Sequence, residues 1–364
     1  MTMRLSSILM TAAAVLLAAA CKPAAETAEN ETLIKLRKAV DAGKYMYAHQ
    51  DDLCYGHDGW YQVEGGSDVK YVCGDYPAVV GFDLGDIEHA DSLHNIDGVS
   101  FDFMRKAAEA HVARGGLVTF SWHPDNLFTG GDAWDISSDS VVVSILPGGK
   151  HHEEFMGWLE RAADFLESIK DPQGNPIKAI YRPWHEHMAR WFWWGAPHCT
   201  KEQYIALWKL NYDYFVKERG LTNLVWAFSP NGDVDKEGYM ERYPGDDMVD
   251  ILGLDAYQKD GMEVAAVQAL LKDRLAYMKE LAAEHGKITA LTETGYESIP
   301  DPQWWTGTLA PALEGSGISY VLTWRNAYDR PMHFYGPWKG AACEEDFVKF
   351  HDLESTLFLK DIVE

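Results

Sequence analysis

The sequence predicts a single (β/α)8 (TIM) barrel, in which eight parallel strands alternate with helices. Two observations predict this fold: eight short apolar segments recur along the chain, and amphipathic segments lie between them. No Pro/Ser-rich linker or internal repeat divides the chain after Leu33, so one domain is the simplest organisation. A doubly wound open sheet is the alternative, but its usual Gly-rich phosphate-binding loop is missing, since Gly115-Gly116 is not one.

Each predicted strand is a short apolar run that ends at a polar or turn-forming residue, as buried parallel strands do. The predicted strands cover residues 45–48, 78–82, 117–120, 179–181, 224–227, 250–254, 288–291 and 319–322. Apolar residues recur at helical spacing between them, which predicts helices that include 101–114, 154–169, 201–217 and 264–285. Three long connections, 51–77, 124–152 and 326–346, would then stand on the same rim and shape a cleft.

Residues 1–21 are predicted to be a signal peptide. Arg4 precedes an apolar run, 12–20, that is too short to span a bilayer and ends at Cys21. The run Leu-Leu-Ala-Ala-Ala-Cys resembles a bacterial lipoprotein box, in which the cysteine is lipidated, although Ala18 stands where Leu is usual. The alternative is cleavage at the alanines, which leaves Cys21 an ordinary thiol. We therefore expect an exported protein, anchored by lipid to the bacterial outer membrane.

Residues 22–32 are small, polar and acidic and are predicted to be a linker, which leaves 33–364 as the (β/α)8 domain. Its four cysteines can oxidise in an exported protein. Cys54 and Cys73 flank one Gly- and Tyr-rich connection and are the predicted disulfide, and Cys199 with Cys343 is a second candidate pair. No Cys-x-x-Cys pair is present, so no structural zinc is expected.

The composition restricts the partners. With 32 basic against 56 acidic residues the net charge is -24, and such a protein would repel nucleic-acid backbones. The 14 Trp and 18 Tyr exceed what an average core needs, which favours carbohydrate or another ligand that stacks on rings. We expect a monomer that needs no cofactor.

Residues 179–195, AIYRPWHEHMARWFWWG, combine a short strand, charged residues and four consecutive aromatic rings. The strand would deliver Arg182, His185 and Glu186 to its carboxyl end, where catalytic sites of barrels lie. Aromatic faces stack on the C–H faces of sugars, and burial against them favours the neutral form of a carboxyl group, as a general acid requires. The alternative is that the tryptophans are core and Glu186 is a surface charge. A zinc protease would need His-Glu-x-x-His on a helix, and this spacing differs.

This stretch is similar to the signature of glycoside hydrolase family 26, best known for β-mannanases. The family's Arg-Pro-x-His-Glu block and the following Trp-Phe-Trp-Trp run are matched at Arg182, Pro183, His185, Glu186 and 191–194. The chain departs from the pattern at Ala189, where the family often has Gly. The resemblance implies net retention at β-1,4-mannosidic linkages of mannan, galactomannan or manno-oligosaccharides, through a covalent glycosyl-enzyme.

The resemblance also assigns the two catalytic carboxyl groups: Glu186 as acid/base and Glu293 as nucleophile. Glu293 ends the apolar strand Ile-Thr-Ala-Leu-Thr. Residues after the strands should share one rim whatever their separation, which brings the two acids together. Retention requires carboxyl groups roughly 5–5.5 Å apart. A Tyr257 hydroxyl bonded to Glu293 would favour the charged form of that carboxyl.

Other strand-end residues complete the predicted site. His123, His185, Tyr257 and Trp324 match positions that family members use around the sugar on whose reducing side cleavage occurs, although the histidines could be core residues and Trp324 plain packing. Trp191 is predicted on the acceptor side. The remaining candidates are Arg182 for substrate binding, Trp134 and Phe192 for stacking or support, Asp255 for orienting Tyr257 or an arginine, and, from strand ends alone, His49, Gln50, Asp83, Trp122, Ser229, Asn231 and Arg325.

Three other functions stay open. The same family resemblance admits β-1,3-xylan and mixed-linkage β-glucan, and the choice between internal and chain-end cleavage depends on the rim loops. A lipoprotein that only binds glycans would be expected to lack one carboxylate, yet Glu186 and Glu293 are both present. A metal-dependent hydrolase is disfavoured, because His151-His152 and His185-x-His187 lack a matching acidic ligand set, and no metal is expected.

Overall fold

A computed structural model describes residues 30–363 of the protein. The predicted signal peptide, Cys21 and the linker up to residue 29 lie outside the described residues. The first described helix, α1 (Glu31–Asp41), begins within the last residues assigned to the linker, and the Asn30 side chain caps it. None of the helices in the described part is both long and apolar enough for a membrane crossing.

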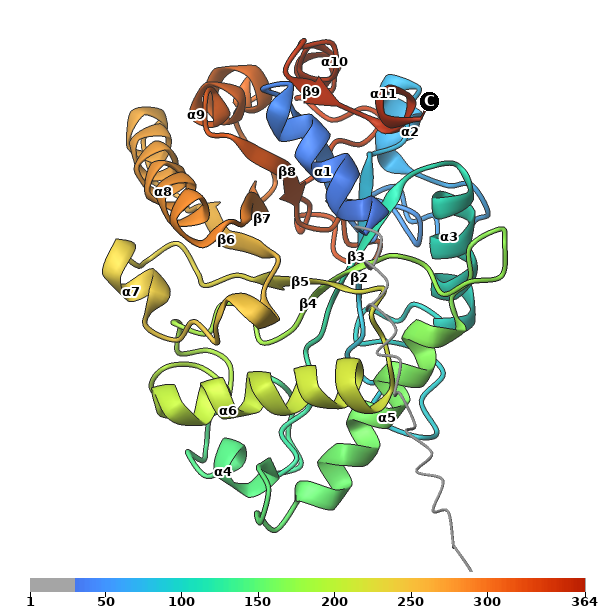
Figure 1. Ribbon diagram of the computed structural model, residues 1–364. Coiled ribbons are helices and arrows are strands. Elements are labelled where there is room, and N and C mark those ends of the chain that lie inside the picture. The colour runs from blue at the N-terminus through green and yellow to red at the C-terminus, as the bar shows by residue number, and fades with distance from the viewer. Residues whose placement is uncertain (1–29, 364) are drawn as a thin grey trace, which may run out of the picture.

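The predicted barrel is confirmed (Figure 1). Its strands are β1 (Tyr45–Gln50), β2 (Val79–Asp83), β3 (Leu117–Ser121), β4 (Ile180–Arg182), β5 (Val225–Phe228), β6 (Ile251–Gln258), β7 (Ile288–Tyr296) and β8 (Ile318–Thr323). All neighbours are parallel, and β1 pairs with both β2 and β8, so the sheet closes into a barrel. A two-residue strand, β9 (Thr356–Leu357), pairs with the start of β1. Each predicted strand matches an observed one.

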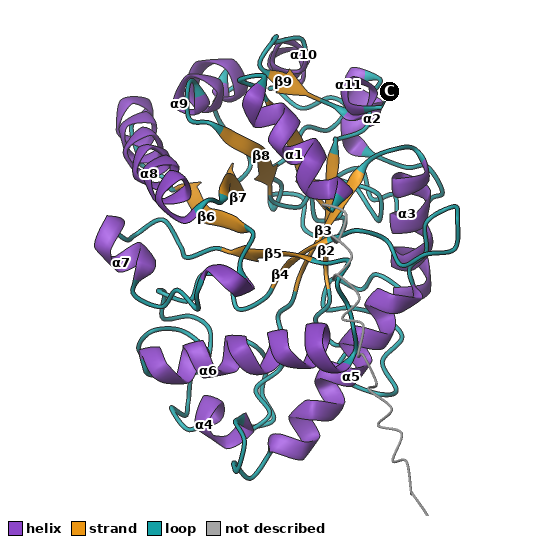
Figure 2. Cartoon of the chain, viewed as in Figure 1, coloured by secondary structure: helices purple, strands orange, loops and turns teal. Residues whose placement is uncertain are grey.

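Helices surround the strands on the outside (Figure 2). They are α2 (Asp68–Cys73), α3 (Phe101–Ala113), α4 (Val141–Ile145), α5 (His152–Ser168), α6 (Lys201–Tyr212), α7 (Lys236–Met240), α8 (Val264–His285), α9 (Ala310–Leu313), α10 (Glu344–His351) and α11 (Leu359–Ile362). The predicted helix 201–217 is α6 followed by a π-helical segment, η1 (Asp213–Glu218). Shorter segments, η2 (Asp246–Met248) and η3 (Trp304–Leu309), precede β6 and α9.

Strand side chains alternate between two hydrophobic clusters, as the two-residue period of a strand dictates. Within β5, Val225 and Ala227 belong to a smaller cluster that also contains Leu36 and Ala39 of α1, so α1 covers one end of the barrel interior. Trp226 and Phe228 of the same strand belong to the large cluster between strands and helices. The residues at the opposite, carboxyl ends of the strands are left to form a site.

The predicted disulfide between Cys54 and Cys73 is wrong. Both are free thiols, as are Cys199 and Cys343. Cys73 ends α2 and donates its thiol to the backbone oxygen of Val69 at 3.2 Å, so it turns back on its own helix. Burial raises the pKa of the Cys54 thiol well above its usual value and that of Cys73 to about 12, and a thiolate is the species that forms disulfides. Although Cys54 and Cys73 flank one connection, their sulfurs do not form a bond.

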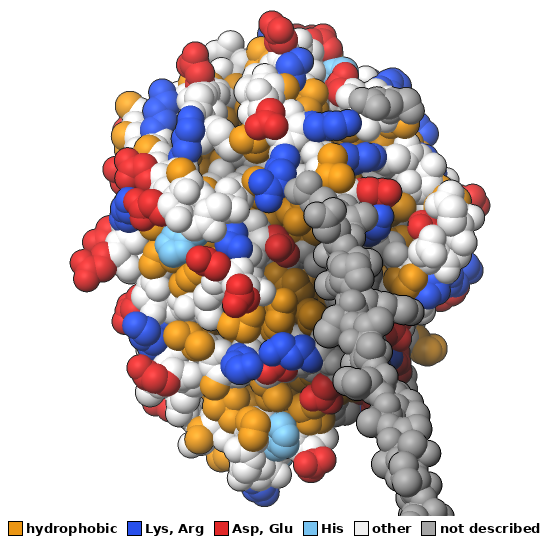
Figure 3. Space-filling view, in the orientation of Figure 1, with side chains coloured by type: hydrophobic (Ala, Val, Ile, Leu, Met, Phe, Trp, Pro, Cys, Tyr) orange, Lys and Arg blue, Asp and Glu red, His pale blue; other side chains and the backbone are white. Residues whose placement is uncertain are grey.

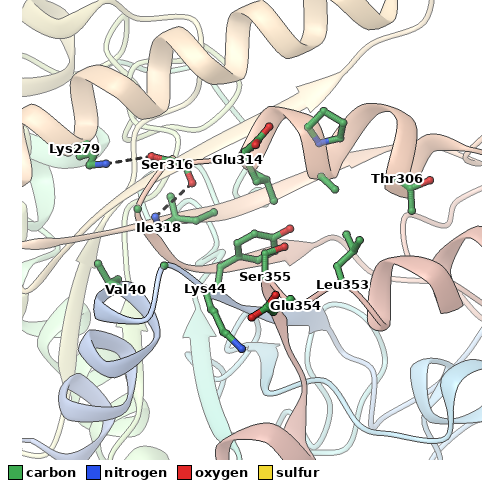
Figure 4. Close-up of a pocket in the computed structure, with 17 residues that line it drawn as sticks. Val40, Lys44, Lys279, Thr306, Glu314, Ser316, Ile318, Leu353, Glu354 and Ser355 are labelled. Atoms are coloured by element: carbon green, nitrogen blue, oxygen red, sulfur yellow. Dashed lines mark hydrogen bonds between the residues drawn. The ribbon is translucent and has the colours of Figure 1, made fainter.

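A cavity of about 650 Å³ opens at the amino ends of β1 and β8, lined by residues that include Lys44, Lys279 and Glu314 (Figure 4). It contains none of the residues predicted for the site. On the face shown in Figure 3, acidic and basic side chains are interspersed.

Candidate active site

The carboxyl ends of the strands bring the predicted catalytic residues together. Glu293 lies on β7, Asp255 on β6, and Glu186 in the loop that follows β4. One carboxylate oxygen from each of these three residues lies within 4.8 Å of the others. This approach of the Glu186 and Glu293 oxygens to within 4.8 Å fits the closely spaced carboxyl pair, roughly 5–5.5 Å apart, that a retaining mechanism uses.

Arg182 is the cation at the centre of this group. It is 2% exposed, and its Nη1 donates to Asp255 Oδ2 at 2.9 Å while its Nη2 donates to Glu293 Oε1. Asp255 also accepts from the hydroxyls of Ser229 at 3.1 Å and Thr292 at 2.6 Å. Asp255 therefore orients an arginine, one of its two predicted roles. Arg182, predicted to bind substrate, is buried and positions Glu293.

Glu293 accepts a second strong hydrogen bond, as predicted. The Tyr257 hydroxyl donates to Glu293 Oε2 at 2.6 Å, so each carboxylate oxygen of Glu293 has its own donor. Donors of this kind stabilise the charged form of a carboxyl group. The side chain is 4% exposed, and its two bonds fix the plane of the carboxylate. Glu293 is thus held in one orientation before any substrate binds.

Glu186 is held by an unusual backbone. Trp184 and Glu186 have φ angles of 53° and 51°. This left-handed conformation costs an L-residue roughly 1–2 kcal/mol. Specific bonds hold this turn in place. The Glu186 amide donates to the Ser229 oxygen at 2.8 Å, and the Tyr204 hydroxyl donates to the Trp184 oxygen at 3.0 Å. Backbone strain of this kind is often found at functional sites.

Glu186 differs electrostatically from Glu293. Burial, reinforced by the negative charges of Glu293 and Asp255, raises the pKa of Glu186 well above its usual value. A hydrogen bond from Trp191 Nε1 to Glu186 Oε2, at 2.6 Å, and the charge of Arg182 act in the opposite direction. The net effect of these surroundings favours the protonated form of Glu186. Sites that need one acid and one base place two similar carboxyl groups in surroundings that push their pKa values apart.

The two predicted histidines form a chain with Asp83. His123 Nδ1 lies 2.7 Å from Asp83 Oδ2, and His123 Nε2 lies 3.0 Å from His185 Nε2. Burial lowers the pKa of His123, but the charge and hydrogen bond of Asp83, together with the charges of Glu293 and Asp97, outweigh burial, and the net shift is upward. Burial and Arg182 lower the pKa of His185 well below its usual value. A protonated His123 therefore donates to both neighbours, and neutral His185 accepts. Asp83, identified only as a strand-end residue, is the member whose role the sequence did not reveal.

The aromatic run at 191–194 divides into one exposed ring and three buried ones. Trp191 is 37% exposed, whereas Phe192, Trp193 and Trp194 are at most 3% exposed. Phe192 stacks on Trp194 with centroids 4.4 Å apart and contacts the edges of His123 and His185. Phe192 therefore supports the histidines. The core interpretation of the run is right for three of its four rings, and only Trp191 reaches the acid.

Two other predicted aromatic residues lie around His123. Trp134 is 47% exposed and lies nearly parallel to the His123 ring, with centroids 5.3 Å apart and an interplanar angle of 13°. Trp324, at the end of β8, is partly buried with its centroid 6.3 Å from that of His123. Trp134 and Trp191 thus leave indole surface open to a ligand near the two acids, and flat apolar surface of this kind suits sugar rings.

The histidines considered as metal ligands do not belong to the acidic clusters of the described residues. In the described range, the acidic groups close enough to share a cation are the Glu186 group and a second one on the connection after β2, formed by Asp86, Glu88, His89 and Asp125. His151, His152 and His187 belong to neither. His187 lies between the rings of Tyr204 and Phe228, and neither ring nitrogen has a hydrogen-bond partner within residues 30–363.

Comparison with characterised proteins follows this geometry. The sequence profile described as glycosyl hydrolase family 26 matches residues 23–306. A mannan endo-1,4-beta-mannosidase of Bifidobacterium adolescentis is 33% identical over 80% of this chain, and the match spans 31% of that longer protein. A protein of the same name from Bacillus subtilis is 28% identical over 70% of this chain and 74% of its own length.

Solved structures agree with the sequence matches. A GH26 beta-mannanase from Bacteroides ovatus, BoMan26A, superposes with a TM-score of 0.87 and 43% identity, covering 92% of this chain and 97% of that one. A modular endo-beta-1,4-mannanase from Cellulomonas fimi superposes with a TM-score of 0.79 and 31% identity, covering 91% of this chain and 76% of that one. With its barrel, its paired carboxyl groups and these matches, the chain belongs to glycosyl hydrolase family 26.

Proposed function

We propose that this protein is a retaining glycoside hydrolase that cleaves β-1,4-mannosidic linkages in mannan or manno-oligosaccharides, with Glu186 as acid/base and Glu293 as nucleophile. The observation that carries the proposal is the approach of the two carboxyl groups at the strand ends, with oxygens within 4.8 Å of each other. The surroundings raise the pKa of Glu186, and each oxygen of Glu293 accepts its own hydrogen bond. The mannosidase and mannanase names of the relatives support mannan as the substrate.

In the first step a Glu293 oxygen attacks the anomeric carbon while Glu186 gives its proton to the glycosidic oxygen. The bond to the leaving sugar breaks, and Glu293 becomes esterified to the sugar that remains. Arg182 and Tyr257 hold the Glu293 carboxylate in one orientation before the attack, so little reorganisation is needed during the reaction.

In the second step Glu186, now ionised, takes a proton from water, and the water oxygen attacks the anomeric carbon and releases Glu293. Esterification removes the negative charge of Glu293, which is one cause of the raised pKa of Glu186. Once the glycosyl-enzyme has formed, Glu186 acts as the general base of the second step. The loss of the neighbouring charge therefore favours a stable ionised Glu186 in the interval when it must accept a proton.

The substrate assignment is tested by reducing-sugar release from mannan, β-1,3-xylan and mixed-linkage β-glucan at equal mass concentration. We expect release from mannan and little from the other two. The C2 hydroxyl is axial in mannose and equatorial in glucose and xylose, so a site built for one places that group wrongly in the others. Faster release from the xylan or glucan would refute the mannan assignment while leaving the acid pair intact. No release from any of them would favour a protein that only binds glycans.

We also propose that Cys21 is lipidated and anchors the exported protein to the outer membrane. The support is the lipoprotein-box-like sequence that ends at Cys21 and the small polar residues after it. Wild-type protein made in a bacterial host should enter the detergent phase in a phase-separation assay, whereas Cys21→Ser should enter the aqueous phase. Equal partitioning of the two proteins would exclude the anchor and favour ordinary signal cleavage.

A further inference from the structure

Arg242 is a buried arginine that the proposed chemistry does not use. It lies between α7 and η2 in the connection from β5 to β6, and it is 3% exposed. Within the described residues its guanidinium has no carboxylate partner, and its acceptors are backbone oxygens and one thiol. Nη2 donates to the oxygens of Ala196, at 3.0 Å, and Cys199. Nη1 shares its two hydrogens among three more distant acceptors, the oxygens of His187 at 3.5 Å and Trp194 at 3.4 Å and Cys199 Sγ at 3.5 Å.

All of these acceptors belong to one segment, residues 187–199, which joins β4 to α6 without an intervening helix or strand. A side chain from a different connection therefore ties the start of this segment to its end. A guanidinium can do this because its planar fork presents several donors in fixed directions, whereas a lysine ammonium is a compact charge with three donors. The carbonyl dipoles pointing at the cation also satisfy a charge that would otherwise be costly to bury.

The segment that Arg242 holds carries Trp191 in its middle. Trp191 Nε1 donates to Glu186 Oε2 at 2.6 Å, and the indole is partly exposed, so packing alone does not fix its position. When Glu186 is neutral, its proton is disfavoured on Oε2, because that oxygen accepts the hydrogen bond from Trp191. The proton is therefore directed to Oε1. The placement of Trp191 decides which oxygen of the acid can give up a proton.

We propose that Arg242 is a positioning residue for the acid Glu186, acting through the 187–199 segment and Trp191. This inference rests on the proposed function, because the placement of the proton matters only if Glu186 is the general acid. The consequence depends on the leaving group. A sugar leaving group must be protonated as it departs, whereas 2,4-dinitrophenolate departs without a proton. A misplaced acid should therefore slow one class of substrate and spare the other.

The test is kcat/KM for mannohexaose and for 2,4-dinitrophenyl β-mannobioside, since this constant reports the steps up to formation of the glycosyl-enzyme. Arg242→Lys should lower kcat/KM for mannohexaose by about 10–100-fold, a part of the full effect of a general acid. The value for the dinitrophenyl substrate should stay within about twofold. Trp191→Phe should show the same pattern. The double variant should be no worse than the poorer single one, because both changes act on one hydrogen bond.

The matched control is Arg219→Lys, because Arg219 lies on the outer surface and pairs with Asp164 and Glu167. This change should leave kcat/KM for both substrates unaffected. Arg242→Gln is a second variant, and circular dichroism verifies that each protein is folded. Equal losses on the two substrates, or additive losses in the double variant, would overturn the proposal. Failure of both Arg242 variants to fold would assign Arg242 to stability alone and overturn it as well. An inactive wild-type protein would instead refute the proposed function.

Discussion

Replacing Glu293 by Gln is expected to lower kcat/KM on mannan by about 10⁴-fold or more, as removal of one member of a catalytic unit does. An amide cannot form the glycosyl ester, and it cannot accept the Arg182 and Tyr257 hydrogen bonds on both of its positions as the carboxylate does. Both poor and good leaving groups should be affected, because the nucleophile acts in every first step. Steady-state rates on mannohexaose and on the dinitrophenyl mannobioside measure this.

The control is Glu297→Gln, a glutamate just beyond β7 whose side chain is 55% exposed and bonded to His333. It should keep full activity. The role of Glu293 is checked further with Glu293→Ala and azide. Azide should attack the dinitrophenyl substrate directly and give an α-glycosyl azide, with release of dinitrophenolate. Activity of Glu293→Gln within tenfold of wild type, or a β-azide product, would remove Glu293 from the nucleophile's place.

Replacing Glu186 by Gln is expected to lower kcat/KM on mannohexaose by about 10³-fold, within the range for loss of a general acid. The dinitrophenyl substrate should still be attacked at nearly the wild-type rate, because its leaving group needs no proton. With Glu186→Ala and azide the trapped glycosyl-enzyme should give a β-glycosyl azide. The two acids are thereby distinguished by product stereochemistry. Equal loss on both substrates would contradict the acid/base role.

The pH profile provides an independent measure of the same residue. Burial and the nearby charges of Glu293 and Asp255 raise the pKa of Glu186, so its protonated form persists to higher pH than in an ordinary glutamate. The first step requires that proton. For wild type, kcat/KM on mannohexaose should therefore be highest below this raised pKa and fall as pH increases through it. The basic limb should be absent in Glu186→Gln, and its persistence there would assign the limb to another group.

The barrel was predictable because a parallel strand buried on both faces needs a short apolar run, and eight such runs were present. That strand pattern also located the site: Glu186 and Glu293 meet because the carboxyl ends of parallel strands share one rim, however far apart they are in sequence. Tyr257 was expected from the family resemblance, and its hydroxyl donates to Glu293. The barrel and its shared rim depend on local sequence and on one topological rule.

Other features depend on contacts that local sequence does not encode. Phe192, Trp193 and Trp194 resemble a sugar-binding cluster by composition, yet they are buried, and Trp193 and Trp194 pack against Trp184. Cys54 and Cys73 flank one connection, but α2 directs the Cys73 thiol back to its own helix. The sequence did not indicate a role for Arg242. Its backbone-oxygen acceptors lie in a segment from another connection, and backbone oxygens are the same in every sequence.

The closure of the barrel between β1 and β8 also bears on when an active molecule can first exist. The hydroxyls of Tyr47 and Thr323 meet at 2.8 Å although 276 positions separate them, so the ring of strands is complete only after nearly the whole polypeptide has left the ribosome. Contacts this distant form slowly, since a long loop must close before they contribute. A nascent chain stalled before β8 would carry both glutamates and lack the enclosure that raises the pKa of Glu186.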